Sequence, residues 1–82
     1  MTQLSVTATL ADVAVGESAD IVGYADHAPI RRFAQMGFVP GRQVTAVRSA
    51  PLGDPIEYSV MGSRVAMRRS DAGAILVEAT AS

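Results

Sequence analysis

The sequence predicts an all-β domain with one short helix, in which five short antiparallel strands form a small β-barrel. Three observations lead to this prediction. Five segments alternate apolar and polar residues with the period of two that is typical of strands. Proline and glycine separate these segments at short intervals, and 82 residues leave room for one hydrophobic core. Closure of the sheet would remove the edges that a lone sheet exposes.

The first element is expected to be a short helical turn. Thr9 is followed three residues later by Asp12, which is the spacing of a capping-box variant. Leu10 and Val13 lie on one face of that turn. Residues 17–24 then alternate, and they predict the first strand.

The helix is predicted over residues 27–36. Asp26 is placed to cap it, Pro29 falls in the first turn where a missing N–H costs nothing, and Gly37 supplies a left-handed stop. Three positions share one helical face and would form the buried stripe, namely Ile30, Phe33 and Ala34.

Four further strands are expected at residues 42–50, 56–61, 64–69 and 75–79. Residues 50–53 match a type I turn, with Pro51 at the second position and Gly53 at the fourth. Gly62 and Ser63 are read as a two-residue hairpin loop. A short capped turn from Ser70 precedes the last strand. The inward positions of these strands are predicted to be Val44, Ala46, Ile56, Tyr58, Val60, Val65, Met67, Ile75, Val77 and Ala79.

Composition excludes several classes of function. Cysteine is absent, so disulfides, thiolate metal sites and thiol nucleophiles are excluded. The formal net charge is −1, which offers no overall positive field for nucleic acid. The N-terminus lacks the pattern of a signal peptide, and no apolar run reaches the ~20 residues that span a bilayer. We expect a cytoplasmic protein that reaches a membrane only through a partner.

Several motifs, taken together in order, resemble the FeoA family. They are Met36-Gly37-Phe38-Val39-Pro40-Gly41, Ala50-Pro51-Leu52-Gly53-Asp54-Pro55-Ile56, Gly62, and Ala66-Met67-Arg68 leading to Ala74-Ile75. Each motif alone is weak because such turns are common. The resemblance covers most of the chain and divides it into an N-terminal extension (residues 1–8), a FeoA-like domain (9–79) and a tail (80–82).

The resemblance implies an SH3-like barrel without catalytic activity or cofactor. It implies a cytoplasmic accessory or regulatory protein of ferrous iron transport. The implied partner is FeoB, the membrane transporter of ferrous iron that carries a cytosolic GTPase domain. Assembly of several copies of the chain stays open.

Two segments are the candidate partner contacts, because stiff turns present apolar side chains there at little entropic cost. The predicted contact residues are Met36, Phe38, Val39, Pro40, Pro51, Leu52, Gly53 and Asp54. Leu52 could instead fold back over the barrel mouth, and the apolar corner at residues 36–39 could be core. Arg64 and Arg68 could meet acidic groups of a partner or simply face solvent.

Two other functions stay open as alternatives. The first is a metal-responsive domain related to the C-termini of iron-dependent repressors, since a similar barrel occurs there. The second is a nucleic-acid-binding barrel, which the acidic composition and the small number of aromatic residues argue against. His27 beside Asp26 is the one hint of a metal ligand pair, but no further ligand supports it, and no metal site is predicted.

Overall fold

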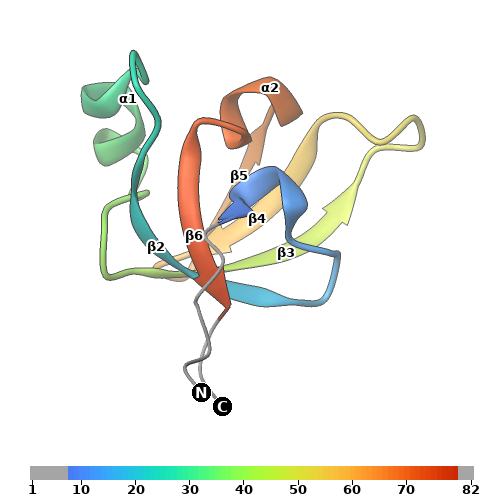
Figure 1. Ribbon diagram of the computed structural model, residues 1–82. Coiled ribbons are helices and arrows are strands. Elements are labelled where there is room, and N and C mark those ends of the chain that lie inside the picture. The colour runs from blue at the N-terminus through green and yellow to red at the C-terminus, as the bar shows by residue number, and fades with distance from the viewer. Residues whose placement is uncertain (1–7, 80–82) are drawn as a thin grey trace, which may run out of the picture.

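One six-stranded antiparallel sheet makes up most of the computed structural model, which describes residues 8–79 (Figure 1). The order of the strands across the sheet is β1-β6-β2-β3-β4-β5. The elements in chain order are β1 (Ala8–Thr9), the 3₁₀ helix η1 (Leu10–Asp12), β2 (Ser18–Tyr24), α1 (Ile30–Gln35), β3 (Gln43–Ser49), β4 (Ile56–Val60), β5 (Ser63–Met67), α2 (Arg69–Ala72) and β6 (Ile75–Ala79).

The all-β prediction is confirmed, but the count of five strands is wrong. Ala8 and Thr9 pair with Val77 and Leu76 and add a sixth strand. Two residues are too few to show an alternating pattern, which explains why the sequence did not reveal this strand. The predicted extension and tail otherwise lie outside the described residues.

Over residues 8–79 the sheet is also not closed into a barrel. In the described part of the chain, β1 and β5 are its two edges and do not pair with each other. The chain passes from β1 directly into η1 and from β5 into α2, and these two helical turns pack together. The two edge strands β1 and β5 are therefore linked by contact between η1 and α2 and not by strand pairing.

The core is enclosed by the inner face of the curved sheet, and α1, η1 and α2 cover its open ends (Figure 1). Tyr58, Phe33, Phe38 and Leu10 are its largest fully buried side chains. The rings of Phe38 and Tyr58 pack edge to face, with their centroids 6.3 Å apart. The predicted inward positions of β3, β4 and β6 are buried, except for Ala79, which is exposed. In β5, Met67 is buried and Val65 is half-buried.

The helix α1 is shorter than predicted, and its buried stripe is narrower. It begins at Ile30, because His27 has φ +66°, which a right-handed helix does not allow. Asp26 does not cap it. Of the predicted stripe, Phe33 is buried, whereas Ile30 is 51% exposed and Ala34 is also exposed. Because α1 has only six residues, it directs one side chain, Phe33, into the core. Its stop at Gly37, with φ +98°, is as predicted.

The hairpin between β4 and β5 turns one residue earlier than the sequence suggested. Val60 pairs with Ser63, so the two loop residues are Met61 and Gly62. Both have positive φ, +54° and +81°, as a type I′ turn requires. Glycine fits this conformation, but methionine fits it poorly.

Replacing Met61 with asparagine should stabilise the protein by about 0.5–1 kcal/mol, because Asn-Gly is the preferred pair for a type I′ turn. Urea unfolding followed by circular dichroism would measure the change in the free energy of unfolding. Met61→Ala is the matched control, since it removes the same side chain but keeps the unfavourable conformation. Equal stability of the asparagine and alanine variants would contradict the prediction.

Candidate partner-binding site

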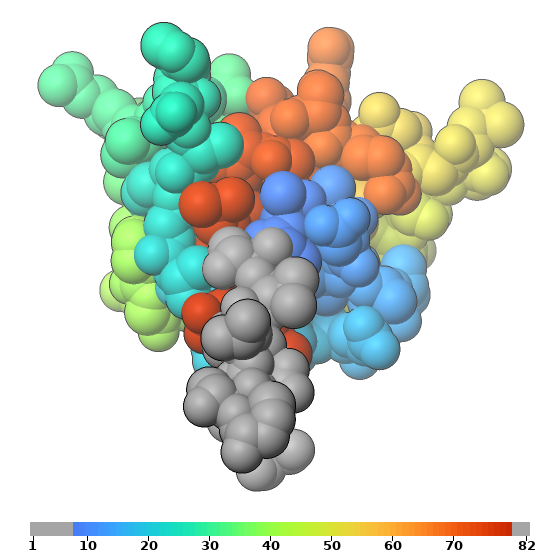
Figure 2. Space-filling view, viewed as in Figure 1, coloured from blue at the N-terminus to red at the C-terminus, as the bar shows by residue number. Residues whose placement is uncertain are grey.

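The turn between β3 and β4, residues 50–55, projects from the body of the protein (Figure 2). The Gly53 N–H donates to the Ala50 carbonyl at 2.7 Å, which agrees with the predicted four-residue turn. The Ala50 N–H donates to the Pro55 carbonyl at 2.9 Å and closes the base of the loop. Leu52 at the tip is 97% exposed. Its side chain therefore does not fold back over the core and is free to contact another molecule.

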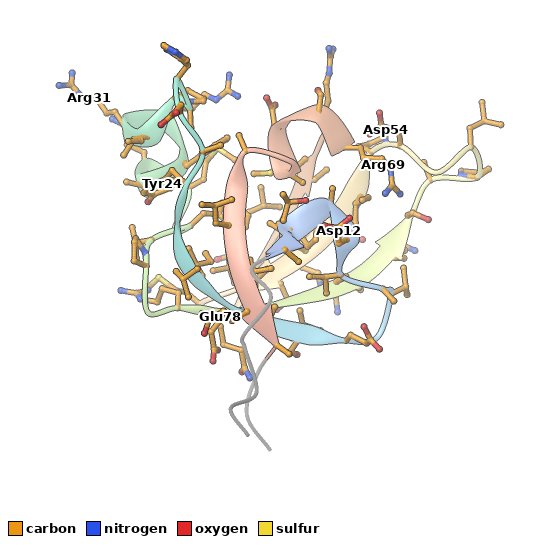
Figure 3. The ribbon with its side chains drawn as sticks, viewed as in Figure 1. Asp12, Tyr24, Arg31, Asp54, Arg69 and Glu78 are labelled. Atoms are coloured by element: carbon orange, nitrogen blue, oxygen red, sulfur yellow. The ribbon has the colours of Figure 1, made fainter. Side chains whose placement is uncertain are left out.

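Arg69 at the start of α2 holds this turn in place (Figure 3). Its backbone N–H donates to the Asp54 carboxylate at 2.8 Å. Its guanidinium donates to the Gly53 carbonyl at 3.0 Å and to the Ala11 carbonyl of η1 at 3.2 Å. The three bonds join segments far apart in the chain, so no local pattern could have indicated them. They fix the base of the turn and leave Leu52 exposed.

The second predicted contact segment, residues 36–40, is only partly accessible. Phe38 is completely buried, and its carbonyl accepts a hydrogen bond from the Tyr24 hydroxyl at 2.7 Å. Met36 and Val39 are half-buried, and Pro40 is exposed. Phe38 therefore cannot offer its side chain to a partner, and the accessible part of this corner is Met36, Val39 and Pro40.

Met61 adjoins this corner, although no local pattern predicted its position there. A Cβ atom added to Gly37 would lie 3.7 Å from the Met61 sulfur, so the tip of the β4–β5 hairpin reaches the end of α1. Met61 is 64% exposed. It enlarges the apolar surface that Met36 and Val39 begin.

The two predicted segments do not form one surface. Residues 36–40 come before β3 and residues 51–54 come after it. A strand of seven residues separates them by roughly 20 Å at the usual rise of ~3.3 Å per residue. Figure 1 shows α1 and the β3–β4 turn at opposite ends of the molecule. A partner would have to be large, or approach twice, to touch both.

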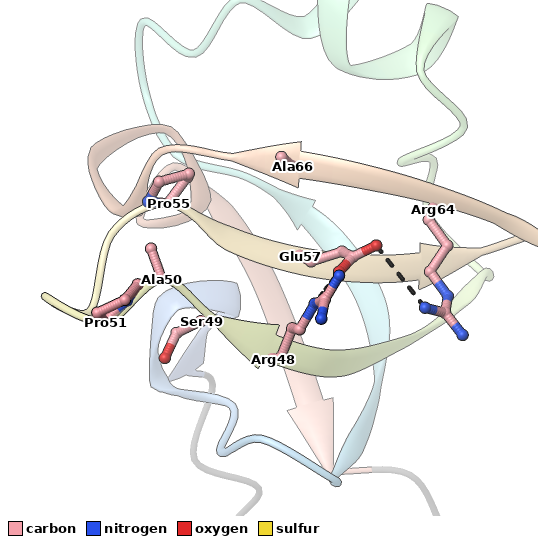
Figure 4. Close-up of a pocket in the computed structure, with 8 residues that line it drawn as sticks. All are labelled: Arg48, Ser49, Ala50, Pro51, Pro55, Glu57, Arg64 and Ala66. Carbon is pink, nitrogen blue, oxygen red and sulfur yellow. Dashed lines mark hydrogen bonds and ion pairs between the residues drawn. The ribbon is translucent and has the colours of Figure 1, made fainter.

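An open groove of about 500 Å³ runs from the turn along the outer face of β3, β4 and β5 (Figure 4). Its end near the turn is apolar and its far end is charged. The apolar end is lined by Ala50, Pro51 and Pro55, and the charged end by Arg48, Glu57 and Arg64. Glu57 accepts from Arg48 Nε at 2.7 Å and lies 3.8 Å from Arg64 Nη1.

A metal cluster and a membrane-spanning helix each place requirements on the described residues. Within residues 8–79, no three histidine, cysteine or carboxylate side chains come close enough to share an ion. His27 and Asp26 are both exposed at the turn before α1. No helix in this part of the chain has the length and hydrophobicity needed to cross a bilayer.

Comparison with known proteins identifies relatives of this chain. The FeoA domain model matches residues 8–79. The chain is 41% identical over 70 residues to the Fe(2+) transport protein A/Fe(2+) transporter FeoB fusion protein of Porphyromonas gingivalis. The match covers 84% of this chain and 8% of the fusion protein, so the chain spans less than a tenth of that relative.

Solved structures with the same fold include a FeoA from Stenotrophomonas maltophilia, described as an SH3 domain protein in complex with zinc. It is 31% identical, with a TM-score of 0.73, and the match covers 84% of this chain and 87% of that one. The predicted SH3-like fold is thereby confirmed. A manganese-dependent transcriptional repressor also matches, with a TM-score of 0.81 over 98% of this chain and 45% of that one. At 17% identity this second likeness shows the fold alone.

Proposed function

The chain belongs to the FeoA family, and from this premise we propose that it is a cytoplasmic accessory protein of ferrous iron transport that docks on a FeoB-type transporter. Docking is a contact between proteins, without catalysis by this chain. The observation that carries the proposal is Leu52, which is 97% exposed on a turn held by Arg69. A rigid turn loses little conformational entropy when it binds, so one apolar anchor there is effective.

The relative from P. gingivalis supports the choice of partner, because it carries the two proteins in one chain. A covalent link keeps two domains at high effective concentration. Docking also requires a contact surface on the FeoA domain itself. The β3–β4 turn is the most exposed apolar feature that the described residues offer for this contact.

Replacing Leu52 with glutamate should weaken capture of the detergent-solubilised FeoB-type transporter of the same organism by about tenfold or more. The free energy of unfolding should change by less than about 0.5 kcal/mol, since the side chain touches almost nothing in the fold. Capture on immobilised protein, with the bound transporter measured by immunoblot, tests the first expectation, and urea unfolding tests the second.

Val15→Glu is the matched control, because Val15 is also apolar and 55% exposed but lies in the turn before β2. It should bind like the wild type. Arg69→Gln should give an intermediate loss, because it frees the turn without removing Leu52. Absence of capture by the wild type would refute docking, whereas normal capture by Leu52→Glu would refute only the assignment of the contact.

A further inference from the structure

Among residues 8–79, no strand pairs with one side of the β5 backbone. Within the described residues β5 is the last strand of the sheet and pairs only with β4. Its register with β4 is regular from Ser63 to Met67. In an antiparallel pair, hydrogen-bonded and non-hydrogen-bonded positions alternate. Because Ser63 and Val60 close the hairpin, Ser63, Val65 and Met67 bond to β4, and Arg64 and Ala66 direct their N–H and C=O groups outward.

The side chains of the same two residues line the outer groove (Figure 4). Arg64 stands at its charged end, and Ala66 leaves open space between that end and the prolines at the other. The groove and the free backbone edge are therefore adjacent parts of one surface. An extended segment that paired with β5 would place every second side chain over this groove.

The charge of this surface selects the kind of segment. The groove has two arginines and one glutamate, on a protein whose formal net charge is −1. Glu57 bonds closely to Arg48, and its separation from Arg64 is 3.8 Å. The side chain of Arg64 is 62% exposed, and its guanidinium has five N–H donors, so it can bind a second carboxylate.

We propose that the free edge of β5 binds an extended acidic segment of a partner protein by strand addition. An acidic residue lies opposite Arg64 at the charged end of the groove. An apolar residue two positions away lies opposite Ala66 and covers the side of the groove that Ala66 lines. The groove begins at the turn that carries Leu52 but does not include the Leu52 side chain, and the proposal holds whether or not the transporter supplies the segment.

Two other occupants fit this surface less well. A second copy of the chain, pairing β5 with β5, would bring the arginines of both strands onto one face, where like charges repel. Nucleic acid could meet the arginines, but it has no peptide backbone to pair with Arg64 and Ala66. Glu57 would also repel its phosphates.

The test is an NMR titration of the ¹⁵N-labelled protein with a capped seven-residue peptide. Its second and sixth residues are glutamate, its fourth is leucine, and its odd positions are threonine and valine. We expect the largest changes in amide chemical shift at Arg64 and Ala66. Binding should weaken as the salt concentration rises, because salt screens the charges. The same peptide with glutamine in place of both glutamates should bind several-fold more weakly.

Two variants separate the charge from the edge. Arg64→Gln should weaken binding about 2- to 5-fold, as expected for an exposed ion pair. Ala66→Pro should weaken it about 3- to 10-fold, because it removes an outward N–H without removing a bond to β4. Arg31→Gln is the matched control, an exposed arginine on α1, and should bind like the wild type.

Several results would overturn the proposal. These are no amide shifts at millimolar peptide, shifts that avoid β5, or equal binding of the glutamate and glutamine peptides. Binding of a single-stranded oligonucleotide with loss on Arg64→Gln, where the peptide fails, would assign the surface to nucleic acid instead. A dimer in sedimentation that Ala66→Pro dissociates would assign it to self-pairing. Should Ala66→Pro not fold, the wild-type shifts and Arg64→Gln still decide the outcome.

Discussion

Replacing Phe38 with alanine is expected to lower the free energy of unfolding by about 3–5 kcal/mol. The side chain is completely buried and packs edge-on against Tyr58, so truncation leaves a cavity and removes an aromatic contact. Small domains have only about 5–15 kcal/mol of stability in total. Urea unfolding followed by circular dichroism would measure the loss as a shift of the unfolding midpoint to a lower urea concentration.

Pro40→Ala is the control from the same corner, where the exposed proline should contribute less than about 1 kcal/mol. Phe38→Leu, which keeps most of the apolar volume, should fall between the two. Equal stability of Phe38→Ala and the wild type would contradict the burial of Phe38 in the core. Loss of partner binding in Phe38→Ala would report unfolding and would not identify Phe38 as a contact.

The stability of the protein is expected to fall steeply between pH 10 and pH 12. Tyr58 is completely buried, and its hydroxyl group donates a hydrogen bond to the Leu10 carbonyl at 3.2 Å. Burial raises the pKa of Tyr58 from 10.0 to about 12, with a smaller upward effect of Asp54 and an opposing effect of Arg69. The folded state therefore keeps this proton at a pH where the unfolded state has lost it.

The direction of the effect follows from the raised pKa. Below pH 10 both states hold the proton, and Tyr58 causes no pH dependence. Above pH 10 Tyr58 ionises in the unfolded state first. This ionisation lowers the free energy of unfolding until Tyr58 also ionises in the folded state near pH 12. Two pKa units correspond to a loss of about 2–3 kcal/mol.

Urea unfolding at intervals from pH 9 to pH 12 would measure this loss, with Tyr58→Phe as the control. The phenylalanine variant should start about 0.5–1.5 kcal/mol lower, because the Leu10 carbonyl loses its donor. It should lack the part of the alkaline decline that Tyr58 causes. Parallel declines in the two proteins would show that Tyr58 does not contribute.

Most of the strands could be predicted from the sequence because side-chain alternation is a local property. Alternation correctly indicated that Val44, Ile56, Tyr58 and Val77 face the core. The turn at residues 50–53 and the stop at Gly37 were also predictable, since proline and glycine restrict or permit backbone angles within a few residues. The motifs that resemble the FeoA family are likewise short segments with glycine or proline, so they too could be recognised from the sequence.

The candidate site was predictable only in part. Pro51 and Leu52 were correctly placed on a turn, but local pattern could not show whether Leu52 faces the core or solvent. Phe38 was included among the contacts, although it lies in the core. Met61 was missed, because its position beside Gly37 depends on how the hairpin meets the end of α1.

The sequence by itself determined the all-β class, the family, most of the inward positions and the stiff turn that carries Leu52. The tertiary structure decided that β1 adds a sixth strand, that the sheet formed by residues 8–79 stays open at β5, and that Arg69 holds the turn through Ala11 and Gly53. The physical reason is distance along the chain. Alternation and turn chemistry act between neighbouring residues, whereas edges, grooves and long-range hydrogen bonds depend on segments that folding alone brings together.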